Sequence, residues 1–552
     1  MGHNREVGAP ELRAEPSQAL RRVNHEQKPP SRASNVPYAH TVGVGASGRF
    51  FKALLALALA SLLTSLFFSF RPTVTFLTLA FTALVAAQAL LRIAAVLAPK
   101  TKYEISKTNK DFSRLSSHDW PLYTVLVPLK DEAHMVRRLI RTLSAIDYPV
   151  ERLQIIFITE EDDPATRSAV TDALIPPFEQ VVVPRRGGAL GPRTKPHALN
   201  IAMAKARGDI ITIYDAEDAP HPQQLKTAVK AFSKHPNWGA LQAPLDYFNT
   251  KESWLSAQFG LEYAAQFHVW IPLMVRLGLP FPLGGTSNHI RRSALDEVRQ
   301  KDMFWDSYNV TEDADLSFRL SAAGWDIGYI TPPTQEEAVS RLRPWTHQRT
   351  RWMKGFMQSW RVHMDKPFMP GGLRGLKRQM TLQLTLGSVL LAGFLHAPIC
   401  LALAFWLGFN WAGQGSLSVP PIVTLSLILG YGSGFSIGAI GALRAGKPHL
   451  LLSLPLMPLY WLCLFVPTYK AAYEYVRKPY YWAKTAHGVS SAIEIETNLP
   501  SAPLPQLSPV MEKTPSSPKP QKPRIQGPPL SKLPEPANDV TAALTKDPKA
   551  AE

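Results

Sequence analysis

Long apolar blocks lie near both ends of the chain and flank a more polar middle. A run of about twenty apolar residues is long enough to cross a bilayer as a helix. Residues 50–98 and residues 380–486 each hold more than one such run. With 552 residues the chain is also too long for one ordinary domain. The pattern therefore predicts a membrane protein with a water-soluble central domain, at residues 103–378.

The formal net charge of +17 at pH 7 comes largely from the two tails and from positions beside the apolar blocks. Basic residues there favour contact with anionic membrane lipid and orient the protein with basic loops in the cytoplasm. No nucleic-acid motif accompanies the charge, so no nucleic-acid partner is expected. Cys400 and Cys463 fall in apolar segments and are too few for a disulfide framework or a zinc cluster.

The first apolar block, residues 50–98, predicts a transmembrane hairpin. It consists of the runs Phe51–Phe70 and Thr73–Leu97, with Arg71 and Pro72 between them. Basic residues on both flanks place both ends of the hairpin in the cytoplasm. These residues are Arg49, Lys52, Lys100 and Lys102.

The second apolar block, residues 380–486, contains the runs Met380–Leu407, Val419–Leu443 and Leu450–Val466. Segment Lys470–Lys484 is basic, yet three simple spans would leave it away from the cytoplasm. Either one run is broken or re-entrant, which prolines in these runs would allow, or the number of spans differs. The prolines concerned are Pro398, Pro455 and Pro458.

The two ends of the chain have a different composition. Residues 1–49 are polar and basic, and residues 487–552 are rich in Pro and Lys. Such segments hold too few apolar residues to form a packed core, so both tails are predicted to be disordered.

The central region alternates apolar strands with helical patterns. Strands are predicted at Tyr123–Leu129, Leu153–Ile158, Val181–Val183 and Ile210–Tyr214. Apolar residues recur at helical spacing between Val136 and Leu143, and Ala198–Ala206 is also predicted as a helix. The alternation predicts an α/β fold with a mostly parallel sheet and helices on both faces. Ligands of such sheets bind beyond the carboxyl ends of the strands.

Acidic side chains follow two of these strands. Asp162 and Asp163 come after the second strand and can bind a base or ribose, although Asp is also common in turns. Asp215 and Glu217 follow the fourth strand, and two carboxylates so spaced can face one hard cation, Mg²⁺ or Mn²⁺. Asp218 comes next in the same loop. A solvated acidic turn is the alternative, because short acidic patterns recur by chance.

A third cluster opens a predicted amphipathic helix. Thr311 there is a candidate N-cap, and acidic residues are favoured in the first turn that follows it. Asp313 is also a candidate general base, because sugar transfer needs a group to take the proton from an attacking hydroxyl. The capping role and the catalytic role are compatible.

A fourth cluster, Gln348-Arg349-Thr350-Arg351-Trp352, precedes the second apolar block. An aromatic ring can stack on a sugar, and Arg can bind phosphate or sugar hydroxyls with two hydrogen bonds. The alternative is a juxtamembrane anchor of Arg and Trp.

The four clusters occur in one order within an α/β region between membrane spans, and here the chain resembles family 2 glycosyltransferases. It is most similar to their membrane-embedded processive branch, which includes cellulose, chitin and hyaluronan synthases. The resemblance covers residues 120–365 and the flanking spans. Supporting segments are Val127-Pro128 with Glu132, Asp147–Pro149, Thr194–Asn200 and Gly284–Ser287.

The resemblance implies a nucleotide-diphospho-sugar transferase fold of the GT-A type and a set of donor-binding residues. Asp162 and Asp163 would contact the uridine of a UDP-sugar, and Lys195 would lie near its phosphates. Asp215 and Glu217 match the Asp-x-Asp that binds metal and diphosphate. This motif here reads Asp-Ala-Glu-Asp, so Asp218 is an alternative to Glu217.

The resemblance also implies the acceptor side. Asp313 would be the catalytic base, with Glu312 beside it. Gln348, Arg351 and Trp352 would hold the acceptor and the pyrophosphate side of the site. Thr286 would also contact the acceptor. A single base implies one displacement with inversion.

The leading interpretation is thus an inverting hexosyltransferase that extends a polysaccharide from UDP-sugars at the bacterial inner membrane. Its catalytic domain would face the cytoplasm, and a periplasmic accessory protein is a compatible partner. The alternative is non-processive transfer of one sugar to a lipid or lipid-linked acceptor. The small number of spans keeps this alternative open, whereas the motif of Gln348, Arg351 and Trp352 favours the polysaccharide. A catalytically dead membrane scaffold would be expected to lack one of the acids, yet all are present.

Overall fold

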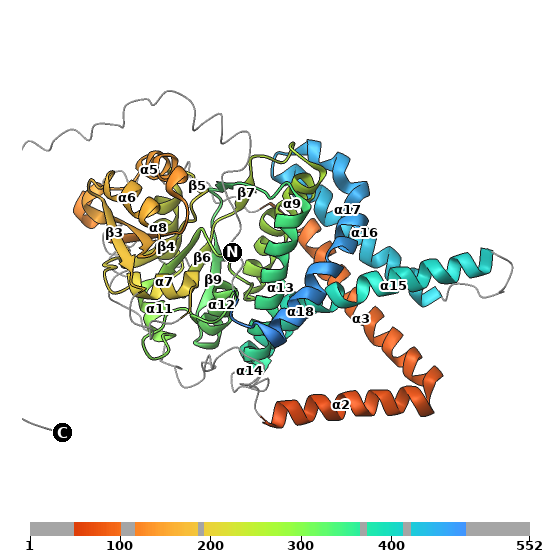
Figure 1. The fold of residues 1–552 in the computed structure, drawn as a ribbon. Helices are drawn as coiled ribbons and strands as arrows, with labels where there is room; N and C mark the ends of the chain where they lie inside the picture. Colours follow the sequence, from red (N-terminus) through yellow and green to blue (C-terminus); the bar gives the residue numbers. More distant parts are fainter. Residues whose placement is uncertain (1–48, 101–115, 186–191, 365–371, 412–420, 482–552) are drawn as a thin grey trace, which may run out of the picture. The chain divides into compact units, whose positions relative to one another are not determined.

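The computed structural model describes residues 49–100, 116–185, 192–364, 372–411 and 421–481 (Figure 1). Every described residue belongs to one structural unit. The two tails predicted to be disordered lie outside the described residues, apart from Arg49. Within the described chain, an α/β region is joined to a group of long apolar helices (Figure 1).

Seven strands form the main sheet, in the order β3-β2-β1-β4-β8-β6-β9. They are β1 (Tyr123–Leu129), β2 (Leu153–Glu160), β3 (Phe178–Val183), β4 (Ile210–Ile213), β6 (Trp238–Gln242), β8 (Asn288–Arg291) and β9 (Asp326–Tyr329). Strand β8 is antiparallel to both of its neighbours, and the other pairings are parallel. The predicted α/β fold with a mostly parallel sheet is therefore confirmed.

A second sheet of three short strands lies in the order β5-β10-β7. The strands are β5 (Ala219–Pro220), β7 (Leu245–Tyr247) and β10 (Thr334–Glu336). Strand β5 follows the acidic loop after β4, so the pairing of β5 with β10 brings the end of β10 close to that loop.

Apolar side chains cover both faces of the main sheet because successive residues of a strand point to opposite faces. Leu126 of β1 joins one core, which includes Leu199 of α7 (Lys195–Ala202). Val125 and Val127 join a second core with α5 (Val136–Ser144) and α8 (Gln224–Lys234). This two-sided burial explains why the first two strands are almost continuously apolar in sequence.

The four predicted strands are all present. Strand β1 has the predicted limits, β2 and β3 extend further than predicted, and β4 ends one residue earlier. The helix predicted at Ala198–Ala206 begins earlier, at Lys195, because Pro196 is favourable in a first helical turn, and it ends earlier, at Ala202.

Further helices complete the α/β region and connect it to the apolar helices. They are α6 (Pro164–Thr171), α9 (Trp254–Ala265), η6 (Gln266–Trp270), α10 (Ile271–Leu277), α11 (Arg292–Glu297), α12 (Glu312–Ala322) and α13 (Leu342–Met364). Helix α12 packs against α13, which in turn packs along α18 (Phe465–Arg477).

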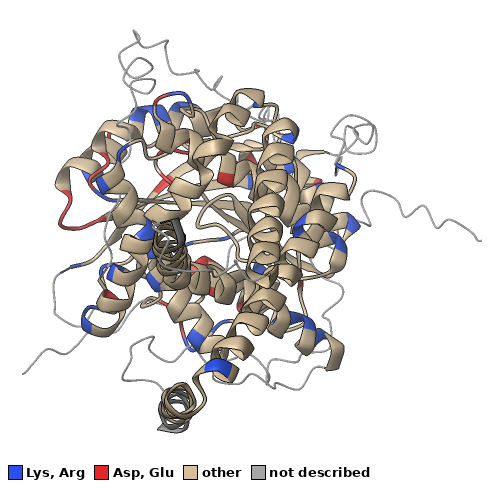
Figure 2. Ribbon diagram, turned by 90° about the vertical axis from the view of Figure 1, so that its right-hand side faces the viewer, with Lys and Arg blue, Asp and Glu red and all other residues tan. Residues whose placement is uncertain are grey.

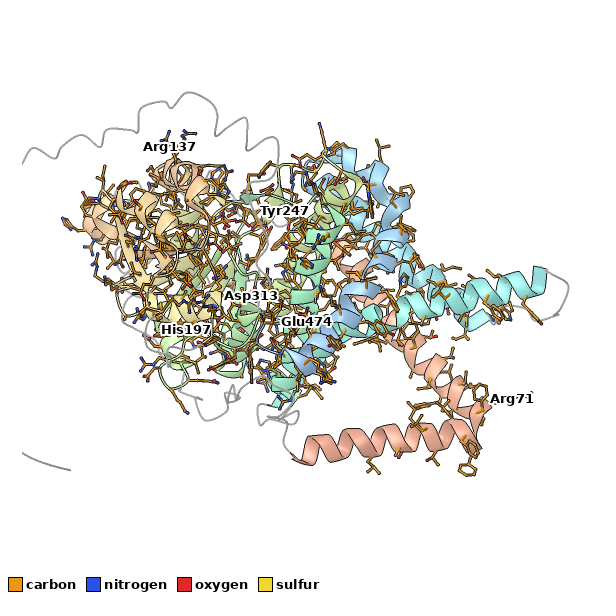
Figure 3. The ribbon with its side chains drawn as sticks, viewed as in Figure 1. Arg71, Arg137, His197, Tyr247, Asp313 and Glu474 are labelled. Atoms are coloured by element: carbon orange, nitrogen blue, oxygen red, sulfur yellow. The ribbon has the colours of Figure 1, made fainter. Side chains whose placement is uncertain are left out.

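Four helical segments among the described residues are long and apolar enough to cross a membrane: Phe70–Leu97, Gly372–Phe409, Pro421–Arg444 and Pro448–Arg477. The long helices α3 (Phe70–Leu97), α15 (Ser388–Trp411) and α16 (Pro421–Arg444) carry few charged side chains (Figure 2). Helix α2 (Arg49–Phe68) precedes α3 and meets it near Arg71 (Figure 3). The transmembrane hairpin at residues 50–98 remains a prediction.

The last of these segments begins and ends against the α/β region. It consists of η8 (Pro448–Leu456), α17 (Met457–Cys463) and α18, with Pro455 inside η8 and Pro458 at the start of α17. Near its start, His449 Nε2 lies 3.0 Å from Thr250 Oγ1. Near its end, Lys354 of α13 donates to Glu474 at 3.1 Å.

The broken or re-entrant alternative for the second apolar block remains a prediction, and these contacts are compatible with it. Helix α15 continues through Pro398, so the interruption lies at Pro455 and Pro458. If the segment re-enters in this way, the basic stretch after Lys470 lies on the side of the α/β region. The charge rule is then satisfied without a further span.

We predict that Tyr473, which is exposed on α18, is reached by water-soluble reagents from the same side of the membrane as the α/β region. In a chain with Cys400→Ser and Cys463→Ser, a membrane-impermeant maleimide applied to intact cells should leave Tyr473→Cys and Glu151→Cys unlabelled. It should label Arg71→Cys at the distant end of α3 (Figure 3). Labelling of Tyr473→Cys together with Arg71→Cys would contradict this topology.

Candidate active site

The candidate site lies where β4 ends, and the direction of β8 explains which residues meet there. Because β8 is antiparallel to β4, the residues before β8 lie beside the loop that follows β4. Ser287 N donates to Ile213 O at 2.8 Å, and Thr286 Oγ1 donates to Asp218 and to Ile213 O. Residues distant in sequence thus meet at one edge of the sheet.

Lys195, at the start of α7, joins this edge. Its Nζ donates to Asp215 and, at 2.8 Å, to Gly285 O. A Cβ atom on Gly285 would lie 3.2 Å from Asp313 Oδ2 and 3.7 Å from Lys195 Nζ. The missing side chain of Gly285 therefore allows the lysine and the carboxylate of Asp313 to approach the same part of the loop.

Asp313 lies in the first turn of α12, where Thr311 occupies the N-cap position without a capping hydrogen bond from its side chain. Burial raises the pKa of Asp313 to about 6, while the nearby charges of Lys195 and Arg351 act in the opposite direction. Burial and the neighbouring Asp313 raise the pKa of Glu312 to about 7. A carboxylate with a pKa slightly below neutral is ionised at pH 7 and still accepts a proton well.

Carboxyl groups crowd the loop after β4. Burial raises the pKa of Asp218 well above its usual range, and the charges of Asp215 and Glu217 add to this effect. Glu336, at the end of β10, also has a raised pKa, because it is buried and faces the charges of Asp218 and Glu217. Asp218 Oδ1 is buried without a hydrogen-bond partner among the described residues.

A divalent cation fits this set of oxygen ligands, because it would offset their mutual repulsion. In the described part of the chain, no three His, Cys, Asp or Glu side chains are arranged so that they alone could hold a metal ion. The predicted pair Asp215 and Glu217 would therefore have to share the ion with oxygens from a ligand such as a diphosphate.

Helix α13 carries the fourth predicted cluster, and it packs against α12. Gln348 Oε1 is buried without a hydrogen-bond partner among the described residues. Trp352 is half-buried and packs on Phe259 of α9, with ring centroids 5.9 Å apart. Trp352, Arg351 and Gln348 thus lie opposite the acidic first turn of α12.

Arg349, between these residues, links three helices. Its two terminal nitrogens donate to the two carboxylate oxygens of Glu262 on α9, at 2.9 and 2.6 Å. Arg349 also donates to Tyr460 Oη of α17 at 2.7 Å, and Tyr460 donates to Glu262 at 2.6 Å. The guanidinium carbon lies 4.6 Å from the ring centroid of Trp352. Arg349 therefore fixes the position of Trp352 relative to both the α/β region and the last apolar segment.

A cavity of about 730 Å³ joins these groups to the apolar helices. Figure 3 shows Asp313 on the side of the α/β region that faces α13 and α18. Nine of the predicted site residues line the cavity: Lys195, Asp215, Glu217, Thr286, Glu312, Asp313, Gln348, Arg351 and Trp352. Side chains of α3, α15 and α16 line the same cavity, and its wall is mostly apolar.

Asp162 and Asp163 do not line this cavity. Asp163 accepts hydrogen bonds from the backbone N–H groups of Thr166 and Asp131 and so caps α6. Asp162 pairs at 2.8 Å with Arg193, which does line the cavity. The uridine contact of these two residues remains a prediction.

Sequence reasoning missed Glu336, Glu262 and Tyr460. Glu336 has no acidic neighbour at a recognisable spacing, apart from the adjacent Glu337. Glu262 and Tyr460 are separated by almost two hundred residues and meet only through the fold. The only feature of the sequence that points to Arg349 is its position between Gln348 and Arg351 in one motif.

The chain is similar to several known proteins. Residues 121–355 match the family described as "Glycosyltransferase like family 2". The chain is 30% identical over 258 residues to beta-monoglucosyldiacylglycerol synthase of Synechocystis sp., covering 46% of this chain and 52% of that protein. It is 24% identical over 325 residues to the cellulose synthase catalytic subunit of Komagataeibacter sucrofermentans, covering 56% of this chain and 40% of that protein.

The chain thus spans about half the length of the curated relatives that match it. Among solved structures, the mannosyltransferase PcManGT from Pyrobaculum calidifontis, in complex with GDP-Man and Mn²⁺, is similar with a TM-score of 0.42 and 19% identity. The similarity covers 69% of this chain and 98% of that one.

The raised pKa of Asp313 predicts a pH dependence. In an assay of glycosyl transfer, the rate at saturating substrate should be nearly constant above pH 7. It should fall by about tenfold per pH unit below pH 6, because protonated Asp313 cannot accept a proton. The measurement is turnover between pH 4.5 and 8.5, with circular dichroism at each pH to confirm that the protein stays folded. A rate that is constant down to pH 4.5 would exclude Asp313 as the base.

Proposed function

We propose that the chain uses residues 121–355, which match the family described as "Glycosyltransferase like family 2", to transfer a sugar from a nucleotide-diphosphate sugar to the hydroxyl group of a membrane lipid. One observation carries the choice of acceptor. The cavity that contains Asp313 continues between α3, α15 and α16, and its wall is mostly apolar. An amphipathic acceptor can place its hydroxyl beside Asp313 and its acyl chains among these helices.

The donor would bind at the edge of the sheet. Lys195 and Arg351 supply positive charge for the two phosphates on the donor side of the cavity. Asp215 and Glu217 would hold Mg²⁺ or Mn²⁺, with Asp218 and Glu336 next to them. When bound, the ion supplies positive charge that stabilises the departing diphosphate.

Asp313 would act as the general base. Its carboxylate takes the proton of the acceptor hydroxyl while the oxygen forms a bond to the anomeric carbon of the sugar. The bond from this carbon to the diphosphate oxygen breaks, and the nucleoside diphosphate leaves with the electron pair. One displacement of this kind inverts the configuration at the anomeric carbon.

The comparisons support a lipid acceptor in part. The matching cyanobacterial relatives are named beta-monoglucosyldiacylglycerol synthases, and their names denote the transfer of a glucosyl group to a diacylglycerol. The four apolar segments are compatible with an inner-membrane enzyme whose α/β region faces the cytoplasm, where nucleotide sugars are made.

Extension of a polysaccharide is the second candidate, and a specific observation favours it. Gln348, Arg351 and Trp352 are on α13 and line the same cavity as Asp313, and the resemblance to processive synthases would give them a role in holding a saccharide acceptor. Polar and aromatic side chains of the membrane helices, including His396, Tyr431 and Trp461, also line the cavity and would suit a saccharide.

The experiment uses the full chain in nanodiscs with Mn²⁺ and a panel of UDP-sugars, with diacylglycerol or an oligosaccharide as acceptor. We predict UDP release that depends on diacylglycerol and a product that carries one sugar, identified by mass spectrometry. The matched control, Asp313→Asn, should lower turnover by about 10²–10⁴-fold, because it removes the base. A long, glycosidase-sensitive product formed without lipid would overturn the lipid proposal in favour of the polysaccharide.

A further inference from the structure

One face of α3 forms part of the cavity wall. The residues that line the cavity are Phe81, Leu84, Val85, Gln88 and Arg92, and their spacing of three or four residues places them on one side of the helix. Four of them are apolar or neutral, whereas Arg92 is charged. The charged residue lies at the end of this face that is closer to the α/β region.

Hydrogen bonds of Gln88 show that this face of α3 points toward η7 and α15. Gln88 Nε2 donates to Leu384 O at 2.5 Å in η7 (Gln383–Gly387), and to Ser388 Oγ at 2.7 Å in α15. Arg92 follows Gln88 by four residues, so its side chain starts from the same side of α3. Arg92 therefore projects toward the cavity between helices and not toward the surrounding lipid.

Arg92 has no hydrogen-bond or ion-pair partner among the residues that the structure describes. Its side chain is half-buried within a segment long and apolar enough to cross a membrane. A guanidinium group in such surroundings is costly unless an anion or several carbonyl oxygens pair with it. Its planar arrangement of N–H groups matches the oxygens of phosphate especially well.

Arg92 lies near the end of α3 that is attached to the α/β region. The end of α3 is held to the rest of the protein, because Arg444 Nη2 donates to Val96 O at 2.9 Å and Arg276 Nη2 donates to Pro99 O at 2.6 Å. Arg92 lies five residues before Leu97, the last residue of α3, a distance of about 8 Å along the helix. Arg92 is thus close to the end of α3 that contacts the α/β region, where a lipid headgroup would be within reach of its long side chain.

We infer that Arg92 binds the phosphate of an acceptor lipid and thereby selects phosphate-bearing lipids over neutral ones. The inference rests on the proposed function and narrows its substrate class. The donor diphosphate already has Lys195 at the edge of the sheet and Arg351 of α13, whose charge acts on Asp313. A second cation on α3 therefore serves a different anion, which enters from the membrane.

The test compares phosphatidylglycerol with diacylglycerol of the same acyl chains, as acceptors for the full chain in nanodiscs of neutral lipid. We expect Arg92→Gln to raise the KM for phosphatidylglycerol about tenfold or more and to leave the KM values for the donor and for diacylglycerol unchanged. Arg92→Lys should raise the KM for phosphatidylglycerol less than Arg92→Gln does, because lysine keeps the charge but loses the second hydrogen bond. The control is Lys100→Gln, beyond the end of α3, where the lysine donates to Arg444 O and does not line the cavity.

A second readout separates this inference from the proposed function. Native mass spectrometry measures how much phosphatidylglycerol stays bound to the unmodified protein and to Arg92→Gln, without any turnover. If neither lipid is glycosylated but the substitution removes bound phosphatidylglycerol, the proposed function fails and the lipid-phosphate site stands. Equal retention in both proteins, or an equal rise of KM for both lipids, would overturn the site.

Discussion

Arg349 holds together the parts of the molecule on which the cavity depends. Its two hydrogen bonds to Glu262 and its hydrogen bond to Tyr460 join α9, α13 and α17. Arg349 is buried, so removal of Glu262 would leave a buried charge without its main partner. The position of Trp352 on α13, and the continuity of the cavity between the α/β region and the membrane helices, both follow from this contact.

Two electrostatic environments meet across the cavity. On the sheet side, the carboxyl groups of Asp215, Asp218 and Glu336 repel one another and lie beside Lys195, which favours a cation and a diphosphate. On the membrane side the wall is mostly apolar, with Arg92 as a charged exception. Asp313 lies in this same cavity, so a polar donor and an amphipathic acceptor can reach it from different sides.

Local sequence patterns predicted the elements whose packing is local. Strand β1 has the predicted limits, because its successive residues face two different apolar cores and the run is almost continuously apolar. The loop after β4 and the first turn of α12 also carry the predicted acids at the predicted ends of elements. These signals arise within short segments and need no knowledge of the tertiary fold.

Contacts between distant segments could not be predicted in this way. The antiparallel direction of β8 brings Thr286 to Asp218, and nothing in the local pattern gives a strand its direction. Asp163 has the sequence signature of a ligand-binding acid, yet its side chain caps α6. The return of the last apolar segment depends on Lys354 and Glu474, which lie 120 residues apart.

The central claim is that a membrane lipid reaches Asp313 through the cavity between α3 and α15. A cryo-electron microscopy map of Asp313→Asn in lipid nanodiscs with a UDP-sugar and Mn²⁺ tests it most directly. We expect density for a diphosphate beside Lys195 and Asp215, and lipid density that ends in a headgroup next to residue 313. A cavity closed to the membrane, or one filled by a continuous saccharide chain, would contradict it.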